Sequence, residues 1–326
     1  MRRLVGIIQS ITPARLLTLA GVCFGFVLSR LLKRPILFSS PSFLTVEPVC
    51  GCNLQCPECP VGTNELVRPR GQISLETVDS IIEHLGTKAI WVNLYFQGEP
   101  LLHPNLPEIV AHFSKRKIFT SISTNGLLLT AEMVDGLLEA KLKEIIFSID
   151  GASEEEYLAY RKGGSFSKVV GNIQMVAAKR KAMGLLFPRI VFQSLITSAN
   201  EGNLKNIRRF AKSVGADAVE LKTLNLSHAA DSNNLLPSKS KFSRYSNLGK
   251  KQSRLSCFRL WSNTVIAWDG RMALCCMDKE VDAICGEVFS YPINSWNSVQ
   301  LNGIRARLLT GVDIPRICSR CSLHTL

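Results

Sequence analysis

The hydrophobic and polar residues between positions 43 and 223 follow a pattern that repeats along the chain. Short apolar runs, typical of buried strands, alternate with longer segments whose apolar residues recur every three to four positions, as in amphipathic helices. The strand-like runs are 43–47, 90–96, 118–124, 144–149, 190–196 and 218–222. The helix-like segments are 74–85, 106–116, 131–140, 167–182 and 201–213. Six strands that alternate with helices predict an α/β fold with a parallel sheet, either open or closed.

The ends of these segments carry further signals. Ser74 and Thr130 each precede a helix-like segment, where a hydroxyl can accept a hydrogen bond from the first turn. The alternation stops after Leu224, and Ser, Asn and Lys dominate residues 225–256, which we predict to be a loop or linker. A cysteine-bearing segment of a different character occupies residues 257–326.

The amino-terminal residues 1–40 form a separate segment. Residues 16–29 are uncharged and largely apolar, and they are bounded by Arg15 and Arg30. This run is shorter than the roughly 20 residues that span a bilayer. The start of the chain resembles a signal peptide, but no small-x-small cleavage site ends the apolar run. Two interpretations remain, a helix lying on a membrane surface and a helix docked on the protein.

Composition and charge narrow the class of protein. With 326 residues, 46% of them hydrophobic and 20% charged, the chain suits a globular protein with a large core. The net charge of +13 is concentrated in residues 1–40 and 237–256, which contain no acidic residue. Such blocks attract nucleic acid, anionic lipid or an acidic substrate, whereas a solvated linker is the simpler interpretation of the second. No specific nucleic-acid partner is expected.

Eleven cysteines fall into groups rather than into a disulfide framework. Groups with two-residue spacing in a chain of this size indicate metal binding in a reducing compartment, so we expect a cytoplasmic protein.

The most informative group is Cys-Asn-Leu-Gln-Cys-Pro-Glu-Cys, which carries Cys52, Cys56 and Cys59 just after the first strand-like run. Three thiolates bind three irons of a [4Fe–4S] cube, which leaves the fourth iron open to a ligand that is not protein. Two alternatives exist. A structural zinc site needs four ligands, and no nearby histidine supplies the fourth. Cys50 as a fourth ligand would give a cluster that only carries electrons.

The C-x3-C-x2-C spacing resembles that of the radical S-adenosylmethionine (radical SAM) superfamily. In that family the amino and carboxylate groups of S-adenosylmethionine occupy the open iron. The resemblance implies a partial (β/α)6 TIM-like barrel, with the cluster loop at the carboxyl end of the first strand. It also implies a [4Fe–4S] cluster and S-adenosylmethionine as cofactors.

Further segments resemble the cofactor-binding motifs of this family. Gln97-Gly98-Glu99-Pro100 is similar to its Gly-Gly-Glu-Pro motif, with Gln97 in place of the first glycine. The resemblance implies that Glu99 accepts a hydrogen bond from the ammonium group of S-adenosylmethionine. It also places six polar residues near the cofactor or substrate, namely Ser123, Asn125, Ser148, Asp150, Arg161 and Gln193.

Simpler interpretations of these residues are also open, as turn residues or as ordinary surface or core residues. Asn125 begins an Asn-Gly turn signal, and Asp150 also suits a turn. Ser148 and Asp150 lie two apart on a strand-like run and therefore on one face. The resemblance implies that Arg161 pairs with the methionine carboxylate and that Gln193 reaches the ribose hydroxyls.

The carboxyl-terminal cysteines resemble the SPASM/twitch extension found in part of this family. Gly270 and Cys275 match its Gly-x4-Cys element, and Cys276 competes with Cys275 for that role. The resemblance implies one auxiliary [4Fe–4S] cluster with four ligands, Cys257, Cys275, Cys318 and Cys321. A zinc knuckle built from the same four thiolates is the alternative. Few residues follow Cys321, so we expect no second auxiliary cluster.

Together these features predict four segments, which are 1–40, a radical SAM core at 41–224, a linker at 225–256 and a SPASM/twitch domain at 257–326. The predicted function is reductive cleavage of S-adenosylmethionine and hydrogen abstraction from a peptide, protein or small molecule, with flavodoxin or ferredoxin as electron donor. The rival is a non-catalytic iron–sulfur electron carrier or membrane-tethered scaffold. If residues 1–40 bind lipid, the protein is peripheral at the inner face of the membrane.

Overall fold

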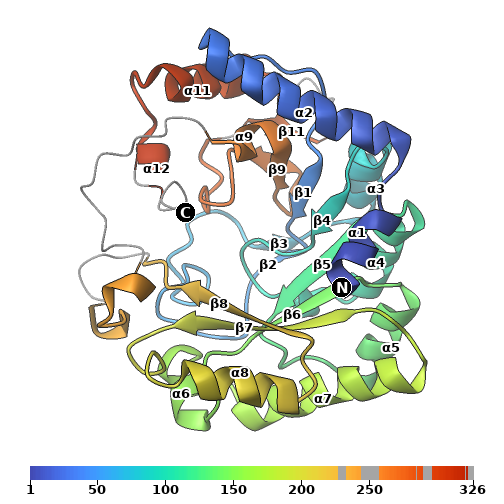
Figure 1. Ribbon diagram of the computed structural model, residues 1–326, viewed down its shortest axis with the longest axis vertical. Helices are drawn as coiled ribbons and strands as arrows, with labels where there is room; N and C mark the ends of the chain where they lie inside the picture. Colours follow the sequence, from blue (N-terminus) through green and yellow to red (C-terminus); the bar gives the residue numbers. More distant parts are fainter. Residues whose placement is uncertain (227–232, 244–256, 284, 289–295, 320, 322–326) are drawn as a thin grey trace.

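The computed structural model describes residues 1–226, 233–243, 257–283, 285–288, 296–319 and 321 (Figure 1). Most of the predicted linker, residues 225–256, lies outside the described residues. Two short 3-10 helices in its described part are η2 (Asn233–Leu235) and η3 (Ser240–Phe242).

A nine-stranded sheet forms the centre of the fold, in the order β11-β10-β9-β1-β4-β5-β6-β7-β8. The six predicted strands are neighbours in this sheet and all run parallel. They are β1 (Phe43–Val46), β4 (Trp91–Asn93), β5 (Phe119–Thr124), β6 (Glu144–Ser148), β7 (Arg189–Ile196) and β8 (Ala218–Thr223). The predicted strand at 90–96 is shorter than expected, because residues 94–96 leave the sheet toward the Gln97 loop.

Helices connect these strands and cover the outer side of the curved sheet (Figure 1). They are α3 (Leu75–Leu85), α4 (Leu106–Lys115), α5 (Ala131–Glu139), α6 (Glu154–Tyr160), α7 (Phe166–Ala182) and α8 (Leu204–Ser213). The predicted caps are confirmed, since Ser74 and Thr130 accept hydrogen bonds from the N–H groups of Thr77 and Met133. The short helix α6 was not predicted. Parallel strands with outer helices confirm the partial (β/α)6 barrel.

The carboxyl-terminal segment extends this sheet, which the sequence did not predict. Strand β9 (Asn263–Ile266) lies parallel to β1, and β10 (Arg271–Ala273) and β11 (Gly286–Glu287) follow in antiparallel order. Within its described residues, this segment has the helices α9 (Arg259–Ser262), α11 (Val299–Thr310) and α12 (Arg316–Ser319). A two-stranded sheet, β2 (Val49–Cys50) with β3 (Gly71–Gln72), flanks the loop that carries the first cysteine group.

The amino-terminal residues form two helices that pack on the barrel, α1 (Arg2–Gln9) and α2 (Pro13–Leu32). Helix α1 closes the amino-terminal end of the strands. Its Arg3 lies over the ring of Trp91 and pairs with the buried carboxylate of Glu144, and Arg2 pairs with Asp217. A side chain at Gly6 would collide with Phe119, so this glycine allows the close approach.

Helix α2 is longer than the apolar run at residues 16–29. The helix continues through Arg15 and Arg30 to 20 residues, so by length and composition alone it could cross a bilayer. Arg15 is nevertheless buried, and its guanidinium donates hydrogen bonds to four backbone carbonyls, those of Ser10, Gly86, Arg116 and Lys117. Three of these carbonyls belong to the carboxyl ends of α3 and α4, where a cation is favourable. The docked interpretation therefore holds for one face of α2.

Candidate active site

A cavity of about 450 Å3 lies at the carboxyl ends of the parallel strands; we call it the main cavity. Loops after β2, β4 and β8 and the ends of β5, β6 and β7 supply its wall. The predicted site residues on this wall are Cys52, Cys56, Cys59, Gln97, Gly98, Glu99, Ser123, Asn125, Ser148, Arg161 and Gln193. Pro100 and Asp150 are the two predicted residues of this set that do not line it. Its volume is ordinary for a small-molecule site.

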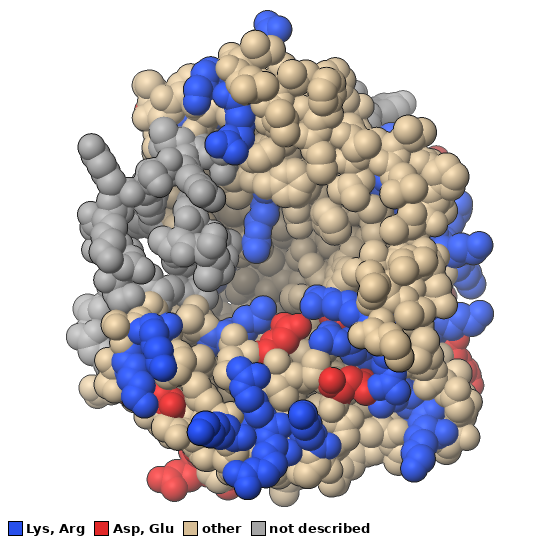
Figure 2. All heavy atoms as spheres, in the orientation of Figure 1, with Lys and Arg blue, Asp and Glu red and all other residues tan. Residues whose placement is uncertain are grey.

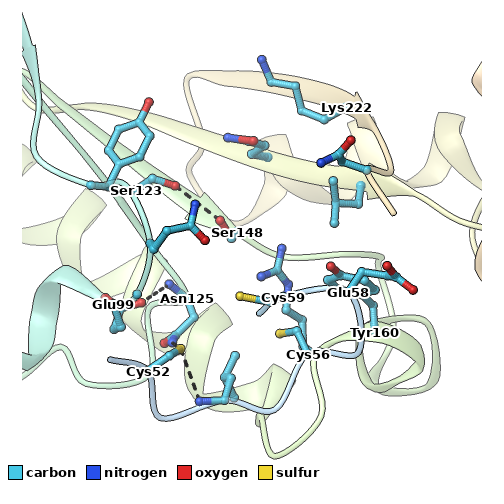
Figure 3. Close-up of a pocket in the computed structure, with 18 of the residues that line it drawn as sticks. Cys52, Cys56, Glu58, Cys59, Glu99, Ser123, Asn125, Ser148, Tyr160 and Lys222 are labelled. Carbon is cyan, nitrogen blue, oxygen red and sulfur yellow. Dashed lines mark hydrogen bonds between the residues drawn. The ribbon is translucent and has the colours of Figure 1, made fainter. Parts of the chain in front are cut away.

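The three thiols of the first group lie around one part of the main cavity (Figure 3). Burial raises the pKa of Cys52, and it raises the pKa of Cys56 to about 11. The Cys52 sulfur accepts a hydrogen bond from the Leu54 N–H at 3.4 Å, and the Asn125 side-chain amide lies 3.9 Å from it. Three converging thiols with nearby donors and an adjoining cavity fit a cluster that has one open iron.

Cys50 does not line the main cavity, unlike these three cysteines. It lies in β2, is 1% exposed and packs with Val61 and Leu66 in a small apolar cluster that Cys52 and Cys59 also contact. Burial raises the pKa of this thiol to about 11. The geometry therefore does not support Cys50 as a fourth ligand, which was the basis of the four-cysteine alternative.

Glu99 connects two of the predicted motifs. Its Oε1 accepts hydrogen bonds from the Leu101 N–H at 3.0 Å and the Thr124 hydroxyl at 2.6 Å, and its Oε2 accepts one from the Asn125 N–H at 2.7 Å. Burial raises the pKa of Glu99, although these three bonds lower it. Because Oε2 accepts only one of these bonds, the carboxylate keeps capacity for a further donor from the cavity.

Glu99→Gln tests this arrangement. The glutamine amide would turn an N–H group toward the Leu101 or Asn125 N–H, leaving a buried donor unpaired, which costs about 1–3 kcal/mol of stability. If the carboxylate also binds the cofactor's ammonium, S-adenosylmethionine binding should weaken by about 1.5–3 kcal/mol. Urea unfolding and cofactor titration measure the two effects. The exposed Glu139, changed to Gln in α5, is the control. Wild-type affinity in Glu99→Gln would contradict the ammonium contact.

The polar residues on the neighbouring strands face the same space. Ser123 and Ser148 have their hydroxyls 3.5 Å apart, and Ser148 stands beside Gln193 in the register of β6 and β7. The Asn125 amide also donates to the Asn53 side chain at 2.8 Å, which fixes it against the cysteine loop. These four residues line the main cavity together.

Asp150 requires a correction. Strand β6 ends at Ser148, so the predicted alternation does not carry Asp150 to the cavity face. Its side chain is fully buried, accepts the Arg161 Nε–H at 2.6 Å and accepts the Leu195 N–H at 2.6 Å. Burial alone would lower the pKa of Arg161, but the Asp150 carboxylate raises it, so the guanidinium stays charged. Asp150 thus positions Arg161, which lines the main cavity.

Pro100 requires a similar correction. It is buried at the start of the 3-10 helix η1 (Pro100–Leu102), which Glu99 caps. Its fixed φ suits the first position of that helix, and we find no contact for it with the main cavity.

Sequence reasoning missed several residues of the wall, among them Tyr95, Phe96, Tyr160 and Lys222. Tyr95 and Phe96 also line a second cavity of about 410 Å3, the inner cavity, together with Asn93, Arg259 and Cys276. Tyr95 and Phe96 directly precede the Gln97 motif, and Lys222 ends a predicted strand. Their position at the carboxyl ends of predicted strands could therefore have indicated that they line the site.

Cysteines of the carboxyl-terminal segment line one apolar pocket. Its wall includes five thiols, those of Cys257, Cys275, Cys276, Cys318 and Cys321. Burial is the main cause that raises the pKa of Cys275, and the neighbouring Cys276, Cys318 and Cys321 add to it. The Cys276 sulfur accepts a hydrogen bond from Arg259 at 3.2 Å. The four predicted ligands and Cys276 therefore line the same pocket.

A buried ion pair that the sequence did not predict joins these parts. Glu47 is fully buried and binds Arg68 through two hydrogen bonds, at 2.6 and 2.8 Å. The same carboxylate accepts the backbone N–H groups of Gln97 at 3.2 Å and Trp268 at 3.3 Å. Arg68 Nε donates to the Lys279 carbonyl at 2.8 Å. One carboxylate thus connects β1, the cysteine loop, the Gln97 motif and the carboxyl-terminal segment.

Comparisons with known proteins agree with this site. The model of the radical SAM superfamily matches residues 46–193, and the model of the SPASM iron–sulfur cluster-binding domain matches residues 257–322. A radical SAM domain uses a [4Fe–4S] cluster with S-adenosylmethionine, and a SPASM domain carries auxiliary iron–sulfur clusters. These matches favour iron–sulfur clusters over the zinc alternatives at both cysteine groups.

Individual relatives cover only part of the chain. The AdoMet-dependent heme synthase of Methanosarcina barkeri is 30% identical over 184 residues, which are 55% of this chain and 50% of the synthase. The mycofactocin maturase MftC of Mycobacterium tuberculosis is 28% identical over 54% of this chain and 43% of the maturase. The chain spans about half the length of the curated relatives it matches.

Solved structures share the fold. Streptococcus suis SuiB bound to S-adenosylmethionine aligns with a TM-score of 0.66 at 14% identity, over 85% of this chain and 70% of SuiB. This likeness extends from the barrel into the carboxyl-terminal segment and confirms the fold class. With both family matches in their expected order, the chain carries a radical SAM superfamily domain followed by a SPASM iron–sulfur cluster-binding domain.

Proposed function

We propose that this protein reductively cleaves S-adenosylmethionine at a [4Fe–4S] cluster held by Cys52, Cys56 and Cys59. The observation that carries this proposal is the convergence of these three thiols on the main cavity, while Cys50 lies outside it. When bound, the cluster and cofactor would supply a 5′-deoxyadenosyl radical that abstracts hydrogen from a substrate. A simple electron carrier has no need for the polar wall opposite these thiols.

The residues of that wall suit the polar groups of S-adenosylmethionine. Arg161, kept charged by Asp150, offers a cation for the methionine carboxylate. The Glu99 carboxylate and the backbone of Gln97 and Gly98 would bind the ammonium group. Four further side chains, from Ser123, Asn125, Ser148 and Gln193, would bind the carboxylate or the nucleoside.

The auxiliary cluster would be bound by Cys257, Cys275, Cys318 and Cys321. We favour Cys275 over Cys276 because Cys275 is the residue that completes the Gly-x4-Cys element after Gly270. The Cys276 sulfur instead accepts the hydrogen bond from Arg259.

The substrate would occupy the inner cavity, which shares Tyr95 and Phe96 with the main cavity and reaches Cys275 and Cys276. A substrate there would lie between the two cysteine groups. We propose a peptide, with a small molecule as the alternative, because the relatives include a mycofactocin maturase and SuiB was solved with a precursor peptide. Flavodoxin or ferredoxin would supply the electron, and the protein would act in the cytoplasm.

The test is anaerobic reconstitution of the full chain with iron and sulfide, followed by reduction with dithionite in the presence of S-adenosylmethionine. We expect 5′-deoxyadenosine and methionine in equal amounts, detected by chromatography. A reconstituted protein that holds its clusters and yields neither product would overturn the proposal in favour of an electron carrier.

A further inference from the structure

Helix α2 exposes an apolar face, whereas a surface helix of a soluble protein usually exposes a polar one. Its docked side includes the partly buried Phe26, which packs edge-to-face on Phe258 and Trp261. The face that packs on the protein carries Arg15, Thr18, Val22, Gly25 and Ser29, all buried, at spacings of three and four residues. Only one of these five is a large apolar residue. The polar ones are used internally, since Ser29 accepts a hydrogen bond from the Trp261 indole at 3.1 Å.

The opposite face of α2 is apolar and exposed. Its large residues are Leu16, Leu17, Phe24, Val27 and Leu31, with exposed fractions between 50% and 74%. Phe24 stacks on Phe38, which is itself 57% exposed. No charged residue interrupts α2 between Arg15 and Arg30, and Figure 2 shows uncharged atoms along the middle of this helix. An apolar strip of this kind on the surface marks an interaction site.

Cations lie at both ends of this apolar strip and indicate an anionic partner. Arg30, Lys33 and Arg34 are exposed at the end of α2. At its start, the backbone of Arg116 and Lys117 contacts Arg15, and both of their side chains are exposed. Residues 1–40 contain no acid. An apolar strip with cations at both ends complements an anionic lipid surface, where side chains enter the acyl boundary and cations contact the headgroups.

The contacts of the buried face decide how α2 meets the membrane. A helix that spans the bilayer would have to give up the four hydrogen bonds of Arg15 and the bond between Trp261 and Ser29. In the docked position only one face is available to lipid. We propose that the exposed face of α2 binds an anionic membrane surface, with the helix in the plane of the membrane and the barrel outside it. This inference is independent of the chemistry at the cysteines.

Flotation of the full-length protein with vesicles tests the proposal. We expect binding to vesicles of phosphatidylglycerol and phosphatidylcholine, weaker binding to phosphatidylcholine alone, and partial release in 0.5 M salt, because screening removes only the charge contribution. Leu17→Glu/Leu31→Glu should lower the bound fraction at least tenfold. The matched control, Met183→Glu/Leu186→Glu, changes two exposed apolar residues next to α7 and should bind like the wild type. Circular dichroism confirms that each variant is folded.

Cys23 provides an independent measurement in the unmodified protein. It is an exposed thiol of α2, adjacent to Phe24. We expect anionic vesicles to slow its alkylation several-fold, as followed by mass spectrometry of the peptide that contains it. Wild-type protein that ignores the vesicles, or equal binding by Leu17→Glu/Leu31→Glu, would overturn the proposal. So would a dimer in sedimentation velocity that the same variant dissolves, because the strip would then be covered by a second copy.

Discussion

Replacing Cys52, Cys56 and Cys59 together by alanine should remove about half of the iron and abolish 5′-deoxyadenosine formation. Two cysteine sets, each holding a [4Fe–4S] cluster, correspond to about eight irons per chain, and the triple variant should retain about four. The loss of product should be complete because the cofactor would meet no open iron. Iron and sulfide analysis after anaerobic reconstitution gives the count, and chromatography gives the product.

Cys50→Ala is the matched control for that variant. Cys50 lies two residues before Cys52 but is buried beside Val61 and Leu66. Its replacement should leave both the iron count and the product unchanged. An iron content that stays the same in the triple variant, or that falls by half in Cys50→Ala, would show that the ligands of the first cluster are wrongly assigned.

The barrel could be predicted because apolar residues recur with a different period in its strands and in its helices. Strands β5, β6 and β7 are largely buried, so their apolar runs are visible without any tertiary information. Strands β9 to β11 are only two to four residues long and lie after a long polar stretch. Nothing in their local pattern indicates that β9 pairs with β1, since that pairing joins residues more than 200 positions apart.

The residues that line the main cavity could be predicted from strand ends, and the two corrections have one cause. Ser123, Ser148 and Gln193 lie within strands whose alternation fixes their direction. Asp150 and Pro100 follow the last residue of a strand or begin a new turn, where alternation no longer applies. The three protein partners of Glu99 come from two different loops, which pattern analysis cannot bring together.

The amino-terminal segment shows a different limit of prediction from sequence. Its cations look equivalent in sequence, but they differ in the structure. Arg15 is buried and Arg2 and Arg3 pair with carboxylates of the barrel, whereas Arg30, Lys33 and Arg34 are exposed at the other end of α2. Arg15 therefore bounds the apolar run in the sequence without ending the helix. Charge counting alone could not separate docking from membrane binding. The structure shows that one face of α2 is docked on the protein, and the membrane contact that we propose uses the opposite face.

Glu47→Gln should lower the free energy of unfolding by about 3–5 kcal/mol, the cost of leaving one partner of a buried ion pair without its counter-charge. Both carboxylate oxygens bind Arg68, and they also accept the N–H groups of Gln97 and Trp268. The N–H2 group of the glutamine amide would replace one carboxylate oxygen and would face the N–H donors that this oxygen now accepts, those of Arg68 and of Gln97 or Trp268. Urea unfolding compared with the wild type measures the loss.

Two further variants separate this effect from general damage. Asp313→Asn breaks an exposed pair with Arg307 and should cost less than about 1 kcal/mol. Glu47→Leu/Arg68→Met replaces the buried pair by apolar side chains and should recover much of the stability, because neither charge is then left alone. Its S-adenosylmethionine binding should stay weaker than that of the wild type, since the N–H groups of Gln97 and Trp268 still lack their acceptor. Full recovery of both properties would mean that Glu47 serves only to neutralise Arg68 and does not position the Gln97 loop.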